Sequence, residues 1–142
     1  MRISIGNDHA GVEHKKQIQK YLFDKNIEVN NYGTDSLDSV DYPDFAHPVS
    51  KDINNQSSDL GILICGSGNG VCMTANKYEK VRAALCWNKE LTILSKMHNN
   101  ANIVCIPARF VDKEEAIEIV KLFISEKFEG GRHEKRVNKI SR

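Results

Sequence analysis

The sequence predicts an α/β fold, a three-layer α/β/α sandwich on a five-stranded, parallel, doubly wound, Rossmann-like sheet. Two observations carry this prediction. Short β-branched segments alternate with longer amphipathic ones along almost all of the 142 residues, as in repeated strand–helix units. The run LGILI at 60–64 is apolar throughout, as expected of a strand covered on both faces. The length suits one domain spanning 1–142.

Five strand–helix units follow from these patterns. We expect strands at 2–6, 27–32, 60–65, 81–85 and 103–106, and helices at about 12–25, 45–54, 70–78, 89–98 and 113–126. Within the first helix, Ile18, Tyr21 and Leu22 recur at helical spacing. The segment 34–43, rich in Asp and Ser, reads as a long surface loop. After Gly130 and Gly131 we expect a basic helical tail at about 132–142, with Val137 and Ile140 as an apolar edge suited to docking.

Composition excludes several classes of partner. Twenty Lys and Arg residues against nineteen Asp and Glu leave a formal charge of +1, so no overall field favours nucleic acid or an anionic membrane. The N-terminal residues enter a strand pattern without a signal peptide, and no apolar stretch is long enough to span a bilayer. We therefore expect a cytoplasmic protein that binds neither nucleic acid nor membrane.

Four cysteines stand at positions 65, 72, 86 and 105, without a CxxC pair or a Cys/His spacing suited to zinc. A disulfide framework is not expected in a domain able to form its own core. Cys72, Cys86 and Cys105 read as small packed residues, and Cys65 needs a separate argument. No metal or cofactor is expected.

The chemistry is predicted at the carboxyl ends of the strands, where open parallel sheets bind ligands. Polar groups follow the first strand (Asp8 and His9), the third (Cys65 and its loop) and the fifth (Arg109). His98 and Asn99 instead close a helix just before the fifth strand. We expect His9 and His98 to reach a shared crevice.

The loop GSGNG at 66–70 joins a buried strand to a helix, so its amides can converge on an anion at the helix N-terminus. It matches neither a P-loop nor GxGxxG, and a plain strand-to-helix turn explains the glycines equally well. Cys65 adds weight, because the positive end of a helix favours a thiolate that can act as base or nucleophile. A C-x5-R phosphatase loop would need arginine where Val71 stands, which argues against that class.

Arg132 and Arg136 are four residues apart, so one helical face could present both to a phosphate. The alternative is a solvated basic tail. The preceding glycine pair and the presence of Arg109 favour the phosphate site.

Taken together, these residues resemble the ribose-5-phosphate isomerase B family, which includes the galactose-6-phosphate isomerase subunits. The similarity runs from Ile3 to about Val137 and rests on the order and spacing of several blocks: GNDHAG at 6–11, DYP at 41–43, GILICGSGNG at 61–70, ANK at 75–77, HN at 98–99, Asn102, EGGRH at 129–133 and Arg136. One branch of the family uses a glutamate directly after the loop. Val71 occupies that position, so the chain resembles the cysteine branch.

The resemblance implies an aldose–ketose isomerase in which Cys65 is the base and a cis-enediolate the intermediate, without metal or cofactor. His98 would open the furanose ring, assisted by Asp8 or Ser67. The other implied substrate contacts are the amides of Gly66, Ser67, Gly68, Asn69 and Gly70 on the enediolate, Asp8 and His9 on hydroxyls or phosphate, Asn99 on a sugar oxygen, and Arg109, Arg132 and Arg136 on phosphate. Family members resemble homodimers with sites shared between subunits, possibly as dimers of dimers.

Three alternatives stay open at this point. The favoured reaction is the interconversion of ribose 5-phosphate and ribulose 5-phosphate, and the alternative substrate is a hexose 6-phosphate such as allose or galactose 6-phosphate. The chain could also be a non-catalytic module that binds phosphosugars or nucleotides, since fold does not fix function. A third reading makes Cys65 a redox sensor, with oxidation more plausible as a vulnerability than as the function.

Overall fold

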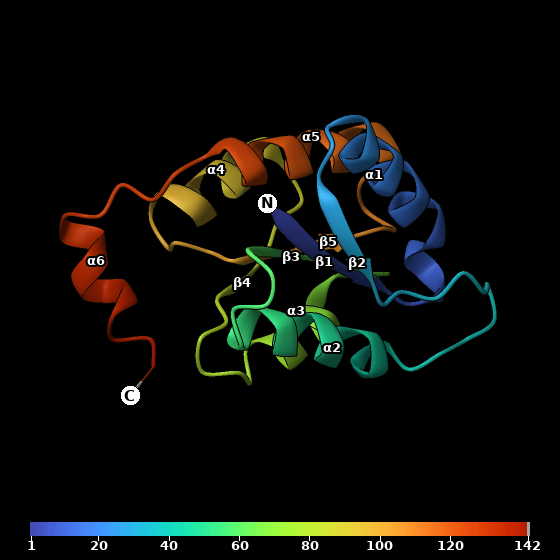
Figure 1. The fold of residues 1–142 in the computed structure, drawn as a ribbon, viewed down its shortest axis with the longest axis horizontal. Helices are drawn as coiled ribbons and strands as arrows, with labels where there is room; N and C mark the ends of the chain where they lie inside the picture. The colour runs from blue at the N-terminus through green and yellow to red at the C-terminus, as the bar shows by residue number, and fades with distance from the viewer. Residues whose placement is uncertain (142) are drawn as a thin grey trace.

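In the computed structural model, which describes residues 1–141, five parallel strands form one sheet in the order β2-β1-β3-β5-β4 (Figure 1). The predicted sandwich is confirmed. The strands are β1 (Arg2–Asn7), β2 (Glu28–Asn31), β3 (Leu60–Cys65), β4 (Ala83–Leu85) and β5 (Ile103–Pro107). The helices are η1 (His9–Gly11), α1 (Val12–Asp24), α2 (Tyr42–Asn54), α3 (Asn69–Ala75), α4 (Lys89–Met97), α5 (Lys113–Ser125) and α6 (Arg132–Val137).

Successive side chains along the strands point alternately into two separate hydrophobic cores. In β3, Ile62 and Ile64 join the core under α1 and α5, whereas Leu63 and Cys65 join the core under α2 and α3, because successive strand residues point to opposite faces. Figure 1 shows α1, α4 and α5 on one side of the sheet and α2 and α3 on the other. Cys65 therefore belongs to the α2/α3 face.

Several boundaries differ from the prediction. The loop expected through Pro43 ends earlier, because α2 begins at Tyr42; proline is favourable in a first helical turn, where its missing N–H costs no hydrogen bond. The third helix stops at Ala75, and β4 has only three residues. Of the tail expected to be helical over 132–142, the described part is helical only in α6, which ends at Val137, and Arg142 lies outside the described residues.

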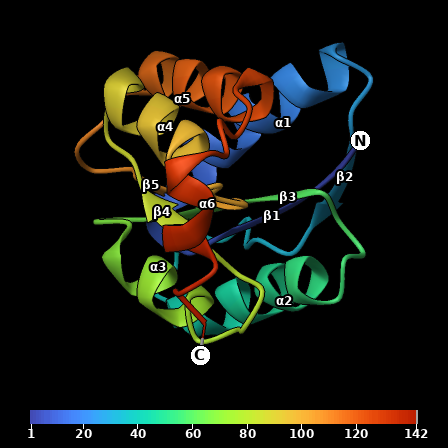
Figure 2. The ribbon, with the colours of Figure 1, turned by 90° about the vertical axis from the view of Figure 1, so that its left-hand side faces the viewer.

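Helix α6 stands outside both layers. Figure 2, viewed from its side, shows it crossing the β4 end of the sheet between the two helical layers. The segment before it is attached by Glu129 N, which donates to Met97 O at 3.0 Å. The segment after it is attached by Ser141 Oγ, which donates to Glu79 O at 2.7 Å. No helix within residues 1–141 combines the length and apolarity that crossing a membrane requires.

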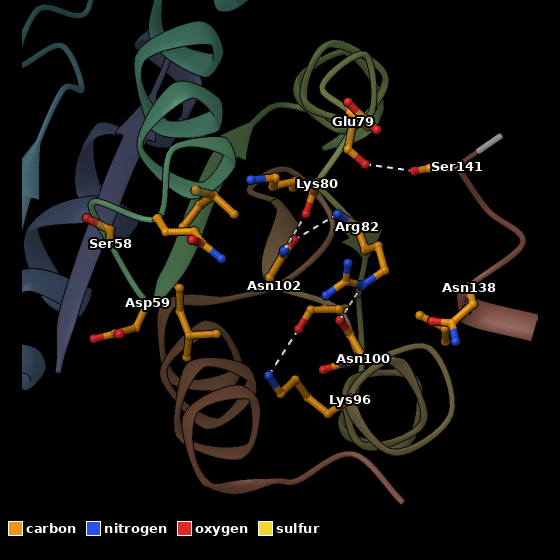
Figure 3. A pocket seen from close by; sticks show the side chains of 15 residues that line it. Ser58, Asp59, Glu79, Lys80, Arg82, Lys96, Asn100, Asn102, Asn138 and Ser141 are labelled. Atoms are coloured by element: carbon orange, nitrogen blue, oxygen red, sulfur yellow. Dashed lines mark hydrogen bonds between the residues drawn. The ribbon is translucent and has the colours of Figure 1, made fainter. Parts of the chain in front are cut away.

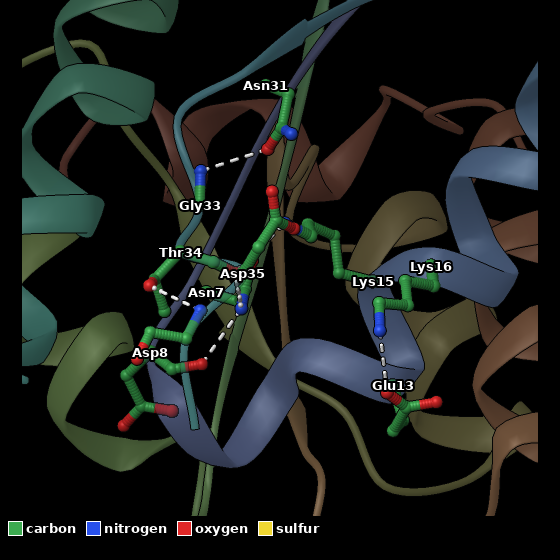
Figure 4. A network of polar contacts seen from close by, with 10 residues as sticks. Asn7, Asp8, Glu13, Lys15, Lys16, Asn31, Gly33, Thr34 and Asp35 are labelled. Atoms are coloured by element: carbon green, nitrogen blue, oxygen red, sulfur yellow. Dashed lines mark hydrogen bonds and ion pairs between the residues drawn. The ribbon is translucent and has the colours of Figure 1, made fainter. Parts of the chain in front are cut away.

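A fully buried lysine anchors the loop between β2 and α2. Lys15 Nζ donates to Thr34 O at 2.9 Å and pairs with the exposed carboxylate of Asp35, whose pKa it lowers (Figure 4). Asn7 Nδ2 donates to the same Thr34 carbonyl at 3.1 Å. Since a buried cation needs partners to offset lost hydration, Lys15 fixes where this loop leaves the sheet.

We predict that Lys15→Met lowers the free energy of unfolding by about 1–3 kcal/mol, because Thr34 O loses a charged donor and the loop loses its ion pair. Urea denaturation of both proteins measures the loss. Lys16→Met is the matched control, since Lys16 pairs with Glu13 on the exposed face of the same helix, and it should shift stability by less than about 0.5 kcal/mol. Equal effects of the two substitutions would contradict the anchoring role.

Candidate active site

The order in which successive strands are added to the sheet reverses between β1 and β3. After β1 the chain forms β2 on one side, and then β3 on the other, so the carboxyl ends of β1 and β3 flank a crevice at the topological switch point. Asn7 is in register with Ile64, and Asp8 N donates to Ile64 O at 3.2 Å. Asp8 and Cys65 therefore leave adjacent strands at the same edge.

The Cys65 thiol lies beneath the glycine-rich loop. Its side chain is only 3% exposed, and Gly68 N donates to Cys65 Sγ at 3.1 Å. Gly68 has φ +73°, and a Cβ there would lie 2.5 Å from Leu85 Cδ1, so only glycine fits this turn without strain. The turn thus supplies an N–H donor to the sulfur and leads directly into α3.

Two further side chains border this loop. Arg109 N donates to Gly66 O at 3.0 Å, and a Cβ on Gly66 would lie 3.0 Å from the Arg109 guanidinium carbon. On the other side the Tyr42 ring covers Gly70, where an added Cβ would lie 2.4 Å away. Arg109 is where the sequence placed it. Tyr42 was missed as a site residue, although it stands in the DYP block that carries the family resemblance.

Asp8 and His9 are oriented by local hydrogen bonds. Asp8, 6% exposed, caps η1 by accepting a bond from Ala10 N on Oδ1 at 2.9 Å. His9 Nδ1 accepts from Val40 N at 3.3 Å, so in the neutral ring the proton sits on Nε2. The 34–41 loop thereby fixes the His9 tautomer and frees Nε2–H for a ligand.

An apolar hollow of about 480 Å³ adjoins the loop. Trp87 and Phe110 are 49% and 74% exposed at its rim, and Ser67 and Asn69 line its polar side. Exposed aromatic side chains beside a polar loop are typical of a surface that a partner or ligand covers.

His98 and Asn99 lie at the opposite edge of the sheet from Cys65. They follow α4 and precede β5, whose first residue, Ile103, is paired with Gly61 at the start of β3. Cys65 is four residues further along β3, about 13 Å at roughly 3.3 Å per residue. Within one chain, the structure therefore does not bring His98 into the crevice of His9 and Cys65.

The second group is organised around α6. The His98 and His133 rings stack with centroids 4.2 Å apart, and Glu129 Oε2 lies 3.9 Å from His98 Nε2 and 3.6 Å from His133 Nε2. Arg132 and Arg136 project from α6 and are exposed. Among residues 1–141, these two histidines and Glu129 are the one group with ligand atoms close enough to hold a metal ion.

Comparison with known proteins decides the family. The model of the ribose/galactose isomerase family matches residues 3–140. The chain belongs to this family. Ribose-5-phosphate isomerase B of Escherichia coli is 37% identical, with 99% of this chain and 94% of that protein covered.

Solved structures of the family agree closely with the fold. A ribose 5-phosphate isomerase from Thermotoga maritima superposes with a TM-score of 0.95 at 46% identity, covering 99% of this chain and 97% of that one. Ribose-5-phosphate isomerase B from Mycoplasma genitalium, solved with bound ribulose 5-phosphate, has a TM-score of 0.94 at 45% identity, covering 98% and 93%.

The residues carried over from the family thus form two groups in one chain. At the carboxyl edge lie Cys65, the loop 66–70, Asp8, His9 and Arg109. Around α6, at the other edge, lie His98, Asn99, Arg132 and Arg136. The sequence already contained the information that predicts this separation. A loop that leads from a helix into a strand of a parallel sheet lies at the amino edge of that sheet.

Protonation of His133 is expected to weaken the α6 attachment. Burial, and then the nearby His98 and Arg132, lower the pKa of His133 below the ordinary 6.5, with Glu129 opposing. The unfolded chain therefore binds the proton more readily. The contribution of neutral His133 to stability is complete above about pH 6.5 and is lost as pH falls through the lower folded value.

We therefore predict that the free energy of unfolding, measured in urea from about pH 7.5 to 5, falls less steeply on acidification in His133→Asn than in the unsubstituted protein. An unchanged slope in His133→Asn would show that this histidine is not the group that couples proton binding to stability.

Proposed function

We propose that this chain is an aldose–ketose isomerase that interconverts ribose 5-phosphate and ribulose 5-phosphate. Membership of the family and the naming of relatives over almost the full chain support the reaction class. The observation that carries the proposal is the thiol of Cys65, held under the glycine loop with Gly68 N–H on its sulfur. A bound sugar carbon above this loop would face a base and a set of amide donors together.

In the proposed mechanism, Cys65 acts as a thiolate. It removes the proton from C2 of the open-chain aldose, so that the C–H bond breaks, an S–H bond forms and the electrons shift into a cis-enediolate. The thiol then returns the proton to C1, while the hydroxyl proton moves from O2 to O1. Amides of residues 66–70 stabilise the developing oxyanion, as preorganised donors do without reorganisation during the reaction. The proposed steps use no metal or cofactor.

The complete site is inferred to need a second copy of this chain. His98, Asn99, Arg132 and Arg136 lie too far along the sheet to reach Cys65 of their own chain. The α6 helix, which bears Arg132 and Arg136, projects from the layers and could carry both arginines to a neighbour (Figure 1). The exposed rim formed by Trp87 and Phe110 beside Ser67 offers the surface on which that neighbour would dock. This geometry supports a homodimer with two shared sites.

Within this shared site each group has a distinct task. His98 of the second copy donates the proton that opens the furanose ring, and Asn99 holds a sugar oxygen. Arg109 of one copy and Arg132 and Arg136 of the other supply positive charge for the phosphate. Asp8 and the Nε2–H of His9 bind sugar hydroxyls or phosphate oxygens at the switch point.

A six-carbon 6-phosphate is the second candidate substrate, because the matched family includes galactose isomerases. The same proton transfer would serve either sugar. Turnover on ribose, allose and galactose phosphates, measured side by side, separates the candidates, and activity confined to the hexose phosphates would overturn the pentose assignment.

We predict that Cys65→Ala lowers kcat by about 10²–10⁴-fold and changes KM little, because the proton-transferring group is lost while the phosphate contacts remain. Coupled assays of ribulose 5-phosphate formation measure both constants. Cys72→Ala is the matched control, since Cys72 lies on α3 with its Sγ donating to Ala83 O, and it should retain most activity. A folded Cys65→Ala protein with unreduced kcat would refute the mechanism.

The shared site predicts complementation between two inactive variants. Cys65→Ala and His98→Asn disable different groups, so a heterodimer purified through two affinity tags should have one intact site and about half of the normal activity. The matched control is a heterodimer of Cys65→Ala and Asp8→Asn. Both substitutions fall in the carboxyl-edge group, so neither of its two sites is intact and it should stay inactive. An inactive Cys65→Ala/His98→Asn heterodimer would show that the two groups do not meet across subunits.

A further inference from the structure

A second cavity opens at the amino edge of the sheet, away from Cys65. Its volume is about 680 Å³, within the roughly 300–1,000 Å³ range of small-molecule sites. Figure 3 shows its wall, built from residues just before β3, β4 and β5 and from the segment that includes Asn138 and Ser141. None of the residues assigned to the isomerase site lines it.

Two cations are fixed next to each other in this cavity. Arg82 Nε donates to Asn100 O at 2.8 Å, and Lys96 Nζ donates to Ala101 O at 3.0 Å. Both side chains line the same cavity, and the charge of Arg82 acts on Lys96 by lowering its pKa, so the guanidinium and the ammonium lie within electrostatic range of each other. Lys96 is 8% exposed and lies 4.7 Å above the centre of the Phe123 ring.

The positive charge of this pair is not balanced by a neighbouring carboxylate. Within residues 1–141, neither Arg82 nor Lys96 takes part in an ion pair. The wall holds two acidic residues, Asp59, which accepts a bond from Arg2 N at 2.7 Å, and Glu79, and among residues 1–141 neither forms an ion pair with these cations. Burial lowers the pKa of both cations, and for Lys96 the charge of Arg82 adds to the effect. A buried ammonium beside a half-buried guanidinium, without a counter-ion, costs free energy.

The wall around the cations is polar and rigid. Asn102 Oδ1 accepts from Arg82 N at 2.7 Å, and Asn102 Nδ2 donates to Lys80 O at 2.8 Å. These bonds fix the backbone that leads into the arginine, and Asn102 N, which donates to Arg82 O at 3.0 Å, fixes the backbone that follows it. A pre-formed cavity with a fork of N–H donors and an adjacent ammonium is suited to a tetrahedral oxyanion, because guanidinium binds phosphate oxygens in pairs.

We propose that this cavity is a second anion site, in which Arg82 and Lys96 bind the phosphate group of a small phosphorylated molecule. The ligand neutralises the paired cations and contacts Asn138 at the end of α6. Because α6 carries Arg132 and Arg136, occupancy is expected to hold the helix in place.

The test is phosphate binding, measured by calorimetry on the full chain with inorganic phosphate as the probe. Arg82→Gln should weaken one class of phosphate binding by at least about tenfold, because the paired donors are lost. Arg132→Ala/Arg136→Ala should leave this class intact while weakening any binding at the isomerase site. The experiment measures phosphate binding and not isomerase activity, so its outcome is independent of whether the isomerase proposal is correct.

Lys96→Met separates a ligand-binding role from a structural one. If Lys96 serves the anion site, removing its uncompensated charge should not lower the melting temperature without phosphate, and the stabilisation by added phosphate should shrink. If its bonds to Ala101 O and Phe123 are only structural, the melting temperature should fall and the phosphate response should persist.

The proposal is overturned if Arg82→Gln binds phosphate within about twofold of the unsubstituted protein, or if the Lys96→Met response to phosphate persists. Acetate serves as the second probe. Acetate binding as tight as that of phosphate would overturn the assignment to a phosphate group, since a carboxylate would then satisfy the same donors.

Discussion

The pairing of β3 between β1 and β5 is the constraint on which the candidate site depends. Ile64 lies beside Asn7 on one side, and Cys65 lies beside Pro107 on the other. The loops that follow all three strands consequently open at one edge, and backbone bonds from Ala108 and Arg109 to Cys65 and Gly66 tie two of them together. A slip of one residue in β3 would turn the Cys65 thiol to the α1/α5 face and away from its loop.

The same register separates the other half of the implied chemistry from Cys65. The parallel strands all start at the amino edge, and the loop that carries His98 must open there. Helix α6 lies outside the layers and bears two exposed arginines, and in the proposed dimer it would present them to the neighbouring chain. Stacking of His133 on His98 then connects the helix to the histidine that the family resemblance assigns to ring opening.

The sequence predicted the features that depend on local pattern. β3 was placed at its observed limits because its six residues are buried on both faces, and the cysteine–glycine turn was found because its residue types are distinctive. Features that depend on packing between distant segments were not predicted. The Tyr42 ring covers Gly70 only because the start of α2 packs against α3. Lys15 is buried only because the backbone at 34–35 lies beside α1. In the sequence, Lys15 is simply one of two adjacent lysines.

Net charge illustrates the limit of composition as a guide to function. A formal charge of +1 predicts no long-range attraction for polyanions, yet it is a sum over groups that differ in partner and burial. Lys16 and Lys121 are exposed and paired with glutamates, so their fields are locally neutral. Arg82 and Lys96 are held on adjacent carbonyls inside a cavity, where water screens them less. The charge that a small ligand meets therefore depends on a few local groups without ion-pair partners, although the chain as a whole is nearly neutral.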